Sequence, residues 1–313
     1  MLQHITKLMF VSLHTARGLA LLAATVLGTP PAFAQSPSNS LGAIPTYPVA
    51  GEPFQLVATY VTFGGTATPV DQTIEVTDQK IVWTVNVQHG SSNTNPALLK
   101  AAVTLSGVSA GVRIVEFYTR DRAFPNPNFS DPTLRLTANV DIFALADAPT
   151  LVEFYNESRK HYFQTTNPAE IAALDTGIFV GWSRTGESYR VYARPSLVSN
   201  SSPLVPVCRY YGLPSAGLDT HFFSAFSFEC NAIPTLYPNA WLEENAAAYW
   251  VQLPGPVDGT CGAGTTGVYR VFNGLPDVNH RYVTKLPLRD VMVALGWISE
   301  GYGPQGVGMC IPL

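Results

Sequence analysis

Three histidines, His161, His221 and His280, recur at intervals of 60 and 59 residues in the second half of this chain. Three imidazoles that converge on one point can hold a zinc ion, as in some catalytic sites. The alternative is that each histidine bonds a turn inside its own unit, because a residue that recurs with a repeated unit needs no shared site. We favour this alternative, since neither a carboxylate that would orient the rings nor a fourth ligand can be named. The sequence therefore predicts no bound metal and no cofactor.

The segments around these histidines repeat as well. Each histidine follows a strand-like stretch, opens a short aromatic stretch and precedes a tryptophan, which is Trp182, Trp241 or Trp297. Self-similarity at a fixed period indicates one supersecondary unit used several times. Each unit should contain two strands, a short helix and a strand that begins near the tryptophan. The three units are expected at about residues 150–204, 205–264 and 265–313.

A single unit of this size cannot bury its own apolar face, so the three units should close about a pseudo-threefold axis. A trefoil-like arrangement is one candidate. The first unit carries the clearest helix signal, in which Asn167 caps the helix, Pro168 takes its first position and Glu170 completes a capping box. Gly177 should end this helix.

Aromatic side chains also recur in the repeat register, and flat rings suit the apolar faces of sugars. Repeated aromatic residues more often belong to a core, where they bury a large apolar area. Because neighbouring residues of a strand point to opposite faces, one ring of each adjacent pair should face outward. The candidate ligand-binding residues are Tyr155, Tyr211, Phe272, Trp182, Trp241 and Trp297.

The repeated residues resemble a repeat family of unknown function found in secreted bacterial proteins. Its units carry an H-F-Y-T-like strand and a W-x-x-E-G-like ending; here Thr284 ends the third histidine strand and Glu300 follows Trp297. The first unit departs from the pattern, because Trp182 is followed by Thr185 at the glutamate position. Such repeats lie at the ends of secreted hydrolases and adhesin-like proteins, so the resemblance implies an accessory or binding role.

The preceding region, residues 48–147, contains about six short stretches of alternating apolar residues separated by glycine-containing turns. This pattern is typical of an antiparallel, immunoglobulin-like sandwich, with Trp83 in its core. The pattern changes at residues 147–149, where we place the domain boundary and expect few buried contacts. The expected fold class is therefore mainly β: an immunoglobulin-like sandwich followed by a pseudo-threefold β-repeat domain with short helices.

One loop of this region, residues 121–131, offers side-chain oxygens such as that of Asp121 for calcium. Its spacing fits no EF-hand loop, and Asn and Asp beside Pro are ordinary turn residues. We expect a turn there.

The first 34 residues have the features of a signal peptide. A basic start precedes an apolar stretch at residues 19–27, and Ala32 and Ala34 fit the small-residue rule for cleavage before Gln35. The apolar stretch is too short to cross a bilayer, so we expect no transmembrane anchor and a secreted or periplasmic protein. Residues 35–47, rich in Pro, Ser and Asn, should form a flexible lead-in.

All four cysteines lie in the repeat part of the chain. An even number of cysteines in an exported protein indicates disulfides, and no spacing typical of a zinc site occurs. We predict that Cys208 pairs with Cys230 and Cys261 with Cys310, because each pair then lies within one unit.

Composition and motifs exclude several function classes. Charged residues make up only 13% of the chain and the net charge is −4, which argues against nucleic acid as a partner. The sequence contains no nucleophile-elbow, zinc-protease or phosphate-loop motif. We expect a non-catalytic binding or adhesion module outside the cytoplasm, with a glycan or cell-envelope polymer as its ligand. The alternatives are a secreted hydrolase that uses the repeat His and Glu residues, and a structural surface spacer.

Overall fold

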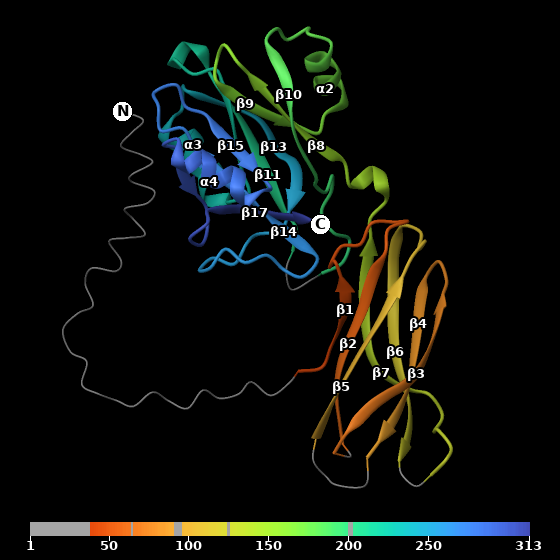
Figure 1. Ribbon diagram of the computed structural model, residues 1–313. Helices are drawn as coiled ribbons and strands as arrows, with labels where there is room; N and C mark the ends of the chain where they lie inside the picture. Colours follow the sequence, from red (N-terminus) through yellow and green to blue (C-terminus); the bar gives the residue numbers. More distant parts are fainter. Residues whose placement is uncertain (1–37, 64, 91–95, 124–125, 200–202) are drawn as a thin grey trace, which may run out of the picture.

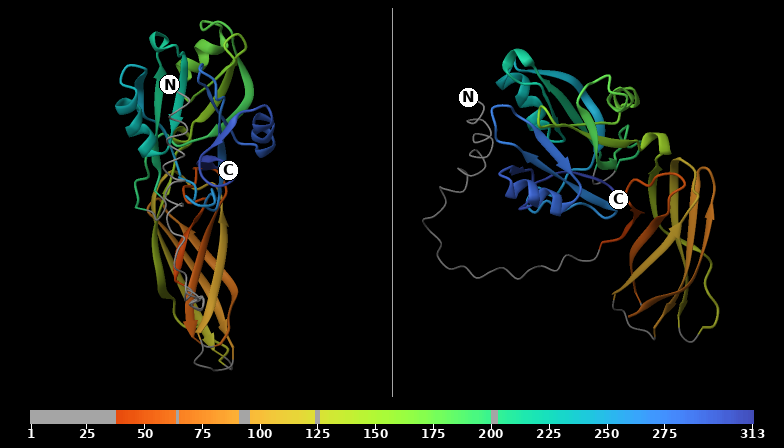
Figure 2. Two further views of the ribbon diagram at one scale, coloured as in Figure 1. Left: turned by 90° about the vertical axis from the view of Figure 1, so that its left-hand side faces the viewer. Right: turned by 45° about the horizontal axis from the view of Figure 1, so that its top comes forward.

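A computed structural model describes residues 38–63, 65–90, 96–123, 126–199 and 203–313 (Figure 1). The chain is mainly β, as expected, with three short α-helices within these residues. Residues 40–142 form a β-sandwich and residues 150–312 form three further sheets. The two parts lie end to end, which both views of Figure 2 show. The expected signal peptide and its cleavage point lie outside the described residues.

The sandwich has two sheets, with the strand orders β1-β2-β5 and β3-β4-β6-β7. Its strands are β1 (Ser40–Ile44), β2 (Phe54–Phe63), β3 (Ala67–Val76), β4 (Lys80–His89), β5 (Pro96–Leu105), β6 (Gly111–Ala123) and β7 (Thr133–Ile142). Every second side chain of β4 is buried, as strand geometry requires for a strand with one face in the core. Trp83 is fully buried and meets Phe117 edge-on at 4.9 Å, so it marks the core as predicted.

Two features of the sandwich differ from the expectation. Strands β4 and β6 pair in parallel, so the larger sheet is not wholly antiparallel. Strand β1 occupies part of the expected flexible lead-in and pairs with β2. The lead-in is structured from residue 40 onward because Leu41 and Ala43 pack on the sandwich core and Tyr47 is fully buried.

Asp121, considered above as a calcium ligand, is used within the sandwich. Its carboxylate accepts hydrogen bonds from Thr119 and Arg135 at 2.8 Å and lies 2.7 Å from His89 Nε2. These contacts tie β4, β6 and β7 together at the end of the sheet.

The three sheets of the second part share one arrangement, in which the first strand lies between the second and the third. The third strand of the last unit is split in two, and both pieces pair with β14. The first unit contains β8 (Thr150–Asn156), β9 (His161–Thr165), α2 (Pro168–Asp175) and β10 (Trp182–Arg190). The second contains β11 (Val205–Gly212), β12 (Thr220–Ser224), α3 (Ser227–Leu236) and β13 (Trp241–Val251). The third contains β14 (Thr265–Phe272), β15 (His280–Val283), α4 (Leu286–Ala294), β16 (Ile298–Glu300) and β17 (Val307–Pro312).

One hydrophobic core joins the three units. The first strand of each unit sends side chains into it, among them Phe154, Val207 and Val268, which are all fully buried. A single unit could not bury its apolar face without the other two. Within the described residues the sheets stay separate and open, so the trefoil-like barrel considered above is not formed.

Helix α2 begins as predicted but its capping box is not closed. The Asn167 side chain accepts the Ala169 N–H at 2.9 Å, and Pro168 takes the first position. Glu170 instead accepts a hydrogen bond from the Thr165 hydroxyl, and Thr165 Oγ1 accepts the Asn167 N–H. The Glu170 carboxylate is therefore available to the second unit.

The two disulfides pair as predicted. Cys208 is bonded to Cys230 and Cys261 to Cys310. The first bond joins β11 to α3, and the second joins the segment before β14 to β17. Two disulfides are compatible with an extracytoplasmic location.

The two parts of the chain share a small core, in contrast to the expected boundary with few buried contacts. Tyr47 and Phe143 of the sandwich pack against Tyr192 and Leu204 of the repeat part. The fully buried Asp141 carboxylate receives two hydrogen bonds from Arg194. Within the linker, Ala148 is buried, whereas the short 3-10 helix (Leu145–Asp147) has no buried residue.

No helix within the described ranges combines the length and the apolar character needed to cross a bilayer.

Candidate functional site

Two of the repeated histidines pair with a glutamate of their own unit. His221 Nε2 lies 3.3 Å from Glu244, and His280 Nε2 lies 3.2 Å from Glu300. Both glutamates are the third residue after the unit's tryptophan, which is the glutamate position of the W-x-x-E motif. Within the described ranges, no three His, Cys, Asp or Glu side chains are grouped so that they could hold a metal ion.

His161 departs from the expectation that each histidine bonds within its own unit. Its Nδ1 lies 3.0 Å from the carbonyl oxygen of Asp219 in the second unit, and its Nε2 lies 3.0 Å from the Asp277 carboxylate in the third. Burial lowers the pKa of His161 and outweighs the opposing effect of Asp277. His161 therefore contacts both other units instead of a turn of its own unit.

Aromatic rings fill the space between the histidines. The Phe163 ring lies 4.5 Å from the His221 ring, and the Phe222 ring 4.9 Å from the His280 ring. The crevice that His221 and His280 line has no room for a water molecule. The centre of the repeat domain is thus packed, and any ligand site must lie nearer its edge.

The units are joined by ion pairs, and we call the contact between the first and second units the first seam. Arg209 of the second unit donates from Nη1 to Glu170 of the first at 2.9 Å, and from Nε to Glu244 of its own unit at 2.6 Å. With His221 behind Glu244, the first seam contains a continuous Glu–Arg–Glu–His chain.

The contact between the second and third units, the second seam, repeats this chain. Arg270 of the third unit bonds both carboxylate oxygens of Glu229 at 2.7 Å and lies 3.2 Å from Glu300. The Arg270 side chain is only 5% exposed, against 15% for Arg209. The same chain is therefore closed off at one seam and accessible at the other.

We call the contact between the third and first units the third seam. At the other two seams the earlier unit of the chain's cyclic order supplies the glutamate and the next unit supplies the arginine; at the third seam these roles are exchanged. Here the first unit supplies the acid, Glu153, and the third unit supplies the base, Arg281, with bonds of 3.1 and 3.0 Å. Lys285 of the third unit also bonds Glu187 of the first at 2.5 Å. Thr185, at the position of the missing motif glutamate, donates to Glu153. Thr185 thus bonds, within its own unit, the carboxylate that pairs with Arg281 of the third unit.

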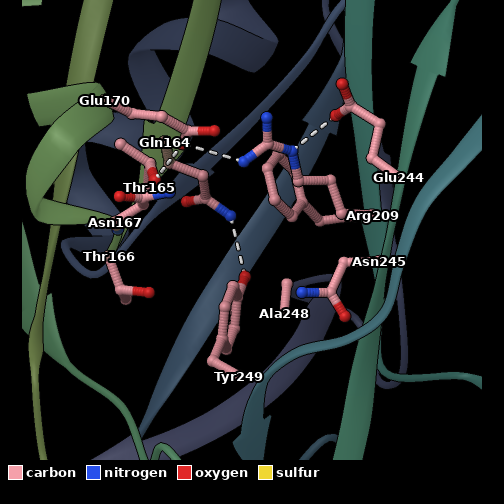
Figure 3. A pocket seen from close by; sticks show the side chains of 11 residues that line it. Gln164, Thr165, Thr166, Asn167, Glu170, Arg209, Glu244, Asn245, Ala248 and Tyr249 are labelled. Atoms are coloured by element: carbon pink, nitrogen blue, oxygen red, sulfur yellow. Dashed lines mark hydrogen bonds and ion pairs between the residues drawn. The ribbon is translucent and has the colours of Figure 1, made fainter. Parts of the chain in front are cut away.

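A pocket of about 270 Å³ opens at the first seam (Figure 3). Its walls come from the turn between β9 and α2 on one side and from β11, β12 and β13 on the other. We call it the first-seam pocket. Its lining is mostly polar and consists of Gln164, Thr165, Thr166, Asn167, Glu170, Arg209, Phe223, Glu244, Asn245, Ala248 and Tyr249.

Two positions explain why the pocket is open at the first seam. The residue at the N-cap is Asn167 for helix α2 and Phe226 for helix α3, and the backbone N–H of each donates to the Thr or Ser hydroxyl two residues earlier. The second residue after the motif glutamate is Ala246 in the second unit and Tyr302 in the third. At the second seam the Phe226 and Tyr302 rings meet at 4.6 Å. Small or polar side chains at the first seam leave that volume unfilled.

The carboxylates of the pocket are held in the ionised form. Burial disfavours the charge of Glu170, but hydrogen bonds from Arg209 and Thr165 outweigh it, so the pKa of Glu170 lies below its usual value. For Glu244, burial is likewise outweighed, by His221 and Arg209, and its pKa is also lowered. Burial lowers the pKa of His221 despite Glu244 beside it. A general acid for glycoside cleavage needs a raised carboxyl pKa, which neither glutamate has.

The six aromatic candidates named above do not line this pocket. The Trp182 ring lies 6.0 Å from Phe163 of its own unit, whereas the Trp241 ring lies 6.2 Å from Phe222 of its own unit and also packs on a cluster that contains Phe272 of the third unit. The Tyr211 hydroxyl bonds Asp219, and Tyr211 and Phe272 each stack beside the histidine opposite them, at 5.1 and 5.0 Å respectively.

Only Tyr155 and Trp297 of these six meet a common ring. Tyr162 lies 4.6 Å from Tyr155 and 5.9 Å from Trp297, and all three side chains are half-buried. Arg281 lies 4.1 Å from the centre of the Tyr162 ring. The structure thus brings these two candidates together on the third seam, away from the first-seam pocket.

The residues that form the pocket were mostly missed by sequence reasoning. Arg209 lies in the opening strand of the second unit and Glu244 at the glutamate position of the W-x-x-E motif, but neither position by itself indicates a pocket. Gln164 and Asn245 carry no signal, because nothing in the sequence says which unit faces which. The usable signal was the recurrence of Arg at positions 209 and 270 together with Glu170 and Glu229, each the third residue of the preceding unit's helix.

A family model described as a domain of unknown function (DUF5648) matches residues 116–251. The match begins within β6, covers β7 and the first two repeat units, and includes every residue of the first-seam pocket. No curated protein matches the chain, and no solved structure does.

Proposed function

We propose that this protein is a non-catalytic, extracytoplasmic binding module and that the first-seam pocket holds one sugar residue of a glycan or cell-envelope polymer. The observation that carries the proposal is the contrast between two equivalent seams. One Glu–Arg–Glu–His chain lies at the seam where the Phe226 and Tyr302 rings meet, whereas the arginine and both glutamates of the other chain line an open polar pocket. Because the equivalent second seam is closed, packing alone does not require a pocket at the first seam, and this supports a binding site there.

The atoms of the pocket suit a polyhydroxylated ligand. The amide nitrogen of Gln164 bonds the Tyr249 hydroxyl at 2.9 Å, which leaves one further amide N–H for a ligand. Arg209 uses Nε and Nη1 for its two glutamates, so Nη2 remains as a donor. Glu170 and Glu244 both use Oε2, so each retains Oε1 as an acceptor. Donors and acceptors of this kind match sugar hydroxyl groups.

The same geometry favours binding over hydrolysis. Glycoside hydrolysis needs one carboxyl that can give a proton and one that stays ionised. Both glutamates of the pocket are stabilised as carboxylates by Arg209. The protein should therefore hold a sugar without cleaving it.

A glycan array tests the proposal with three forms of the protein. Ala248→Phe places a ring in the pocket, and Ala247→Phe is the matched control, because Ala247 is exposed and does not line the pocket. We expect the wild type and Ala247→Phe to retain one class of glycan, and Ala248→Phe to lose about tenfold or more of that binding. Thr166→Trp fills the pocket from the opposite wall, so it provides a second test if Ala248→Phe does not fold.

Three outcomes would overturn the proposal. Equal binding by both phenylalanine variants and by Thr166→Trp would place the ligand elsewhere. Loss of binding in Trp297→Ala alone would move the site to the Tyr155 and Trp297 rings of the third seam. Release of shorter sugars from the bound glycan would replace the binding module by the hydrolase, and absence of any bound glycan would favour the spacer.

A further inference from the structure

The charges of the first-seam pocket do not balance. Glu170 and Glu244 contribute two negative charges and Arg209 one positive charge, which leaves one negative charge in excess. The remaining polar side chains of the lining are amides and hydroxyls without charge. His221 lies behind Glu244 and its pKa is lowered by burial, so it adds no charge at neutral pH.

The excess charge faces the pocket. At the second seam Arg270 occupies both oxygens of Glu229, so that carboxylate is saturated. At the first seam Arg209 spreads its donors over two glutamates, and Oε1 of Glu170 and of Glu244 receives no hydrogen bond from any described residue. Side-chain exposures of 27% for Glu170 and 29% for Glu244 leave these carboxylates within reach of a ligand.

We infer that the first-seam pocket selects a sugar that carries a free ammonium group, that is, a residue of a de-N-acetylated amino sugar polymer. This inference rests on the proposed function and names the ligand class of the same site. An ammonium group supplies three donors and one positive charge, so it matches two free carboxylate oxygens and the missing charge. The neighbouring hydroxyl groups of the ring match Arg209 Nη2 and the spare amide N–H of Gln164.

Other sugar classes match the pocket less well. The carboxylate of a uronic acid would meet two like charges at short range, which disfavours its binding. A neutral sugar would also make charge-assisted hydrogen bonds to the two carboxylates and to Arg209, but it would leave the excess negative charge of the pocket uncompensated. An N-acetyl group removes the charge and adds bulk to a pocket of about 270 Å³, which lies below the common range for ligand pockets.

The test is titration calorimetry with two oligosaccharides of equal length, one of glucosamine and one of N-acetylglucosamine, below the pKa of the sugar amine. We expect the glucosamine oligomer to bind about tenfold more tightly than its acetylated counterpart. Glu244→Gln should reduce that ratio to nearly one. Glu243→Gln is the matched control, because Glu243 is the neighbouring residue but accepts the Tyr210 hydroxyl outside the pocket and should keep the ratio.

Ethanolamine, an amine without a ring, separates recognition of the sugar from recognition of the charge and should bind far more weakly than the glucosamine oligomer. Equal or tighter binding of the acetylated oligomer, an unchanged ratio in Glu244→Gln, or equal binding of ethanolamine would overturn the inference. Glu170→Gln repeats the test if Glu244→Gln does not fold. If the array finds a different glycan in the pocket, the inference fails while the proposed function stands; if it finds none, both fail.

Discussion

Arg270 holds Glu229 with two hydrogen bonds of 2.7 Å across the second seam, where neither side chain is more than 10% exposed. Arg209 holds Glu170 across the first seam with a single bond of 2.9 Å, in partial contact with solvent. The same pair of residue types thus serves two purposes. At the second seam it joins two units, and at the first it also forms the wall of a pocket.

The two arginines should therefore differ in their contribution to stability. Arg270→Met leaves the buried Glu229 with only the Ser224 hydroxyl and the buried Glu300 with only His280, and breaking a buried pair in this way costs about 3–5 kcal/mol. Arg209→Met should cost about 1–3 kcal/mol, because water can reach Glu170 and Glu244. Urea denaturation of both variants measures the difference. Equal losses would show that the exposure of the first seam has no energetic consequence.

Stability should depend on pH through two histidines. Burial lowers the pKa of His161 and His221 from the usual 6.5, so below that pH the unfolded chain binds more protons than the folded protein. The free energy of unfolding should fall as the pH drops through 6.5, and this contribution should level off below the folded-state pKa values. Denaturation curves between about pH 7.5 and 5 test the sign.

His221→Gln should flatten that dependence, because glutamine can donate to Glu244 but does not titrate. A wild-type protein that becomes more stable as the pH falls over this range would contradict the account of the two buried rings.

The disulfide between Cys261 and Cys310 should contribute strongly, because it joins residues separated by 49 positions. Closing a loop of that length removes about 4 kcal/mol of conformational freedom from the unfolded chain in the entropic model. The double variant Cys261→Ser and Cys310→Ser should lose roughly 3–4 kcal/mol of unfolding free energy under oxidising conditions. The corresponding variant of Cys208 and Cys230, separated by 22 positions, should lose somewhat less.

The repeat part should depend on the sandwich for stability. A fragment from Ala148 to the C-terminus loses Tyr47 and Phe143 and thereby exposes Tyr192 and Leu204, which form one cluster with them. Removal of such buried apolar contacts typically costs several kcal/mol. Calorimetry should show a lower melting temperature for the oxidised fragment than for the full chain. Identical melting temperatures would mean that the shared cluster adds nothing.

The fold was largely predictable because its signals are local. Alternation in β4 marks a strand with one buried face, and the recurrence of His161 and Trp182 in later units marks a repeated structure. Disulfide pairing followed from the unit boundaries. Strand β1 was not predicted, because its apolar residues Leu41 and Ala43 are too few to stand out among Pro, Ser and Asn.

The pocket was not predictable for a different reason. Its two walls are separated in sequence, as the pair Glu170 and Arg209 shows, and periodicity does not reveal which units touch. Whether a seam is open depends on single side chains, such as Asn167 in the first unit and Phe226 in the second. Periodicity in the sequence shows the residues that the units have in common, whereas the pocket results from residues that differ between the units.

The most direct test of the central claim is a crystal structure of the protein in complex with the glycan that it retains best on the array. We expect one sugar ring in the first-seam pocket, within hydrogen-bond distance of Glu244 and Arg209, and no ordered sugar at the second seam. A glycan seated on the Tyr155 and Trp297 rings or on the sandwich, with the first-seam pocket holding only water, would contradict it.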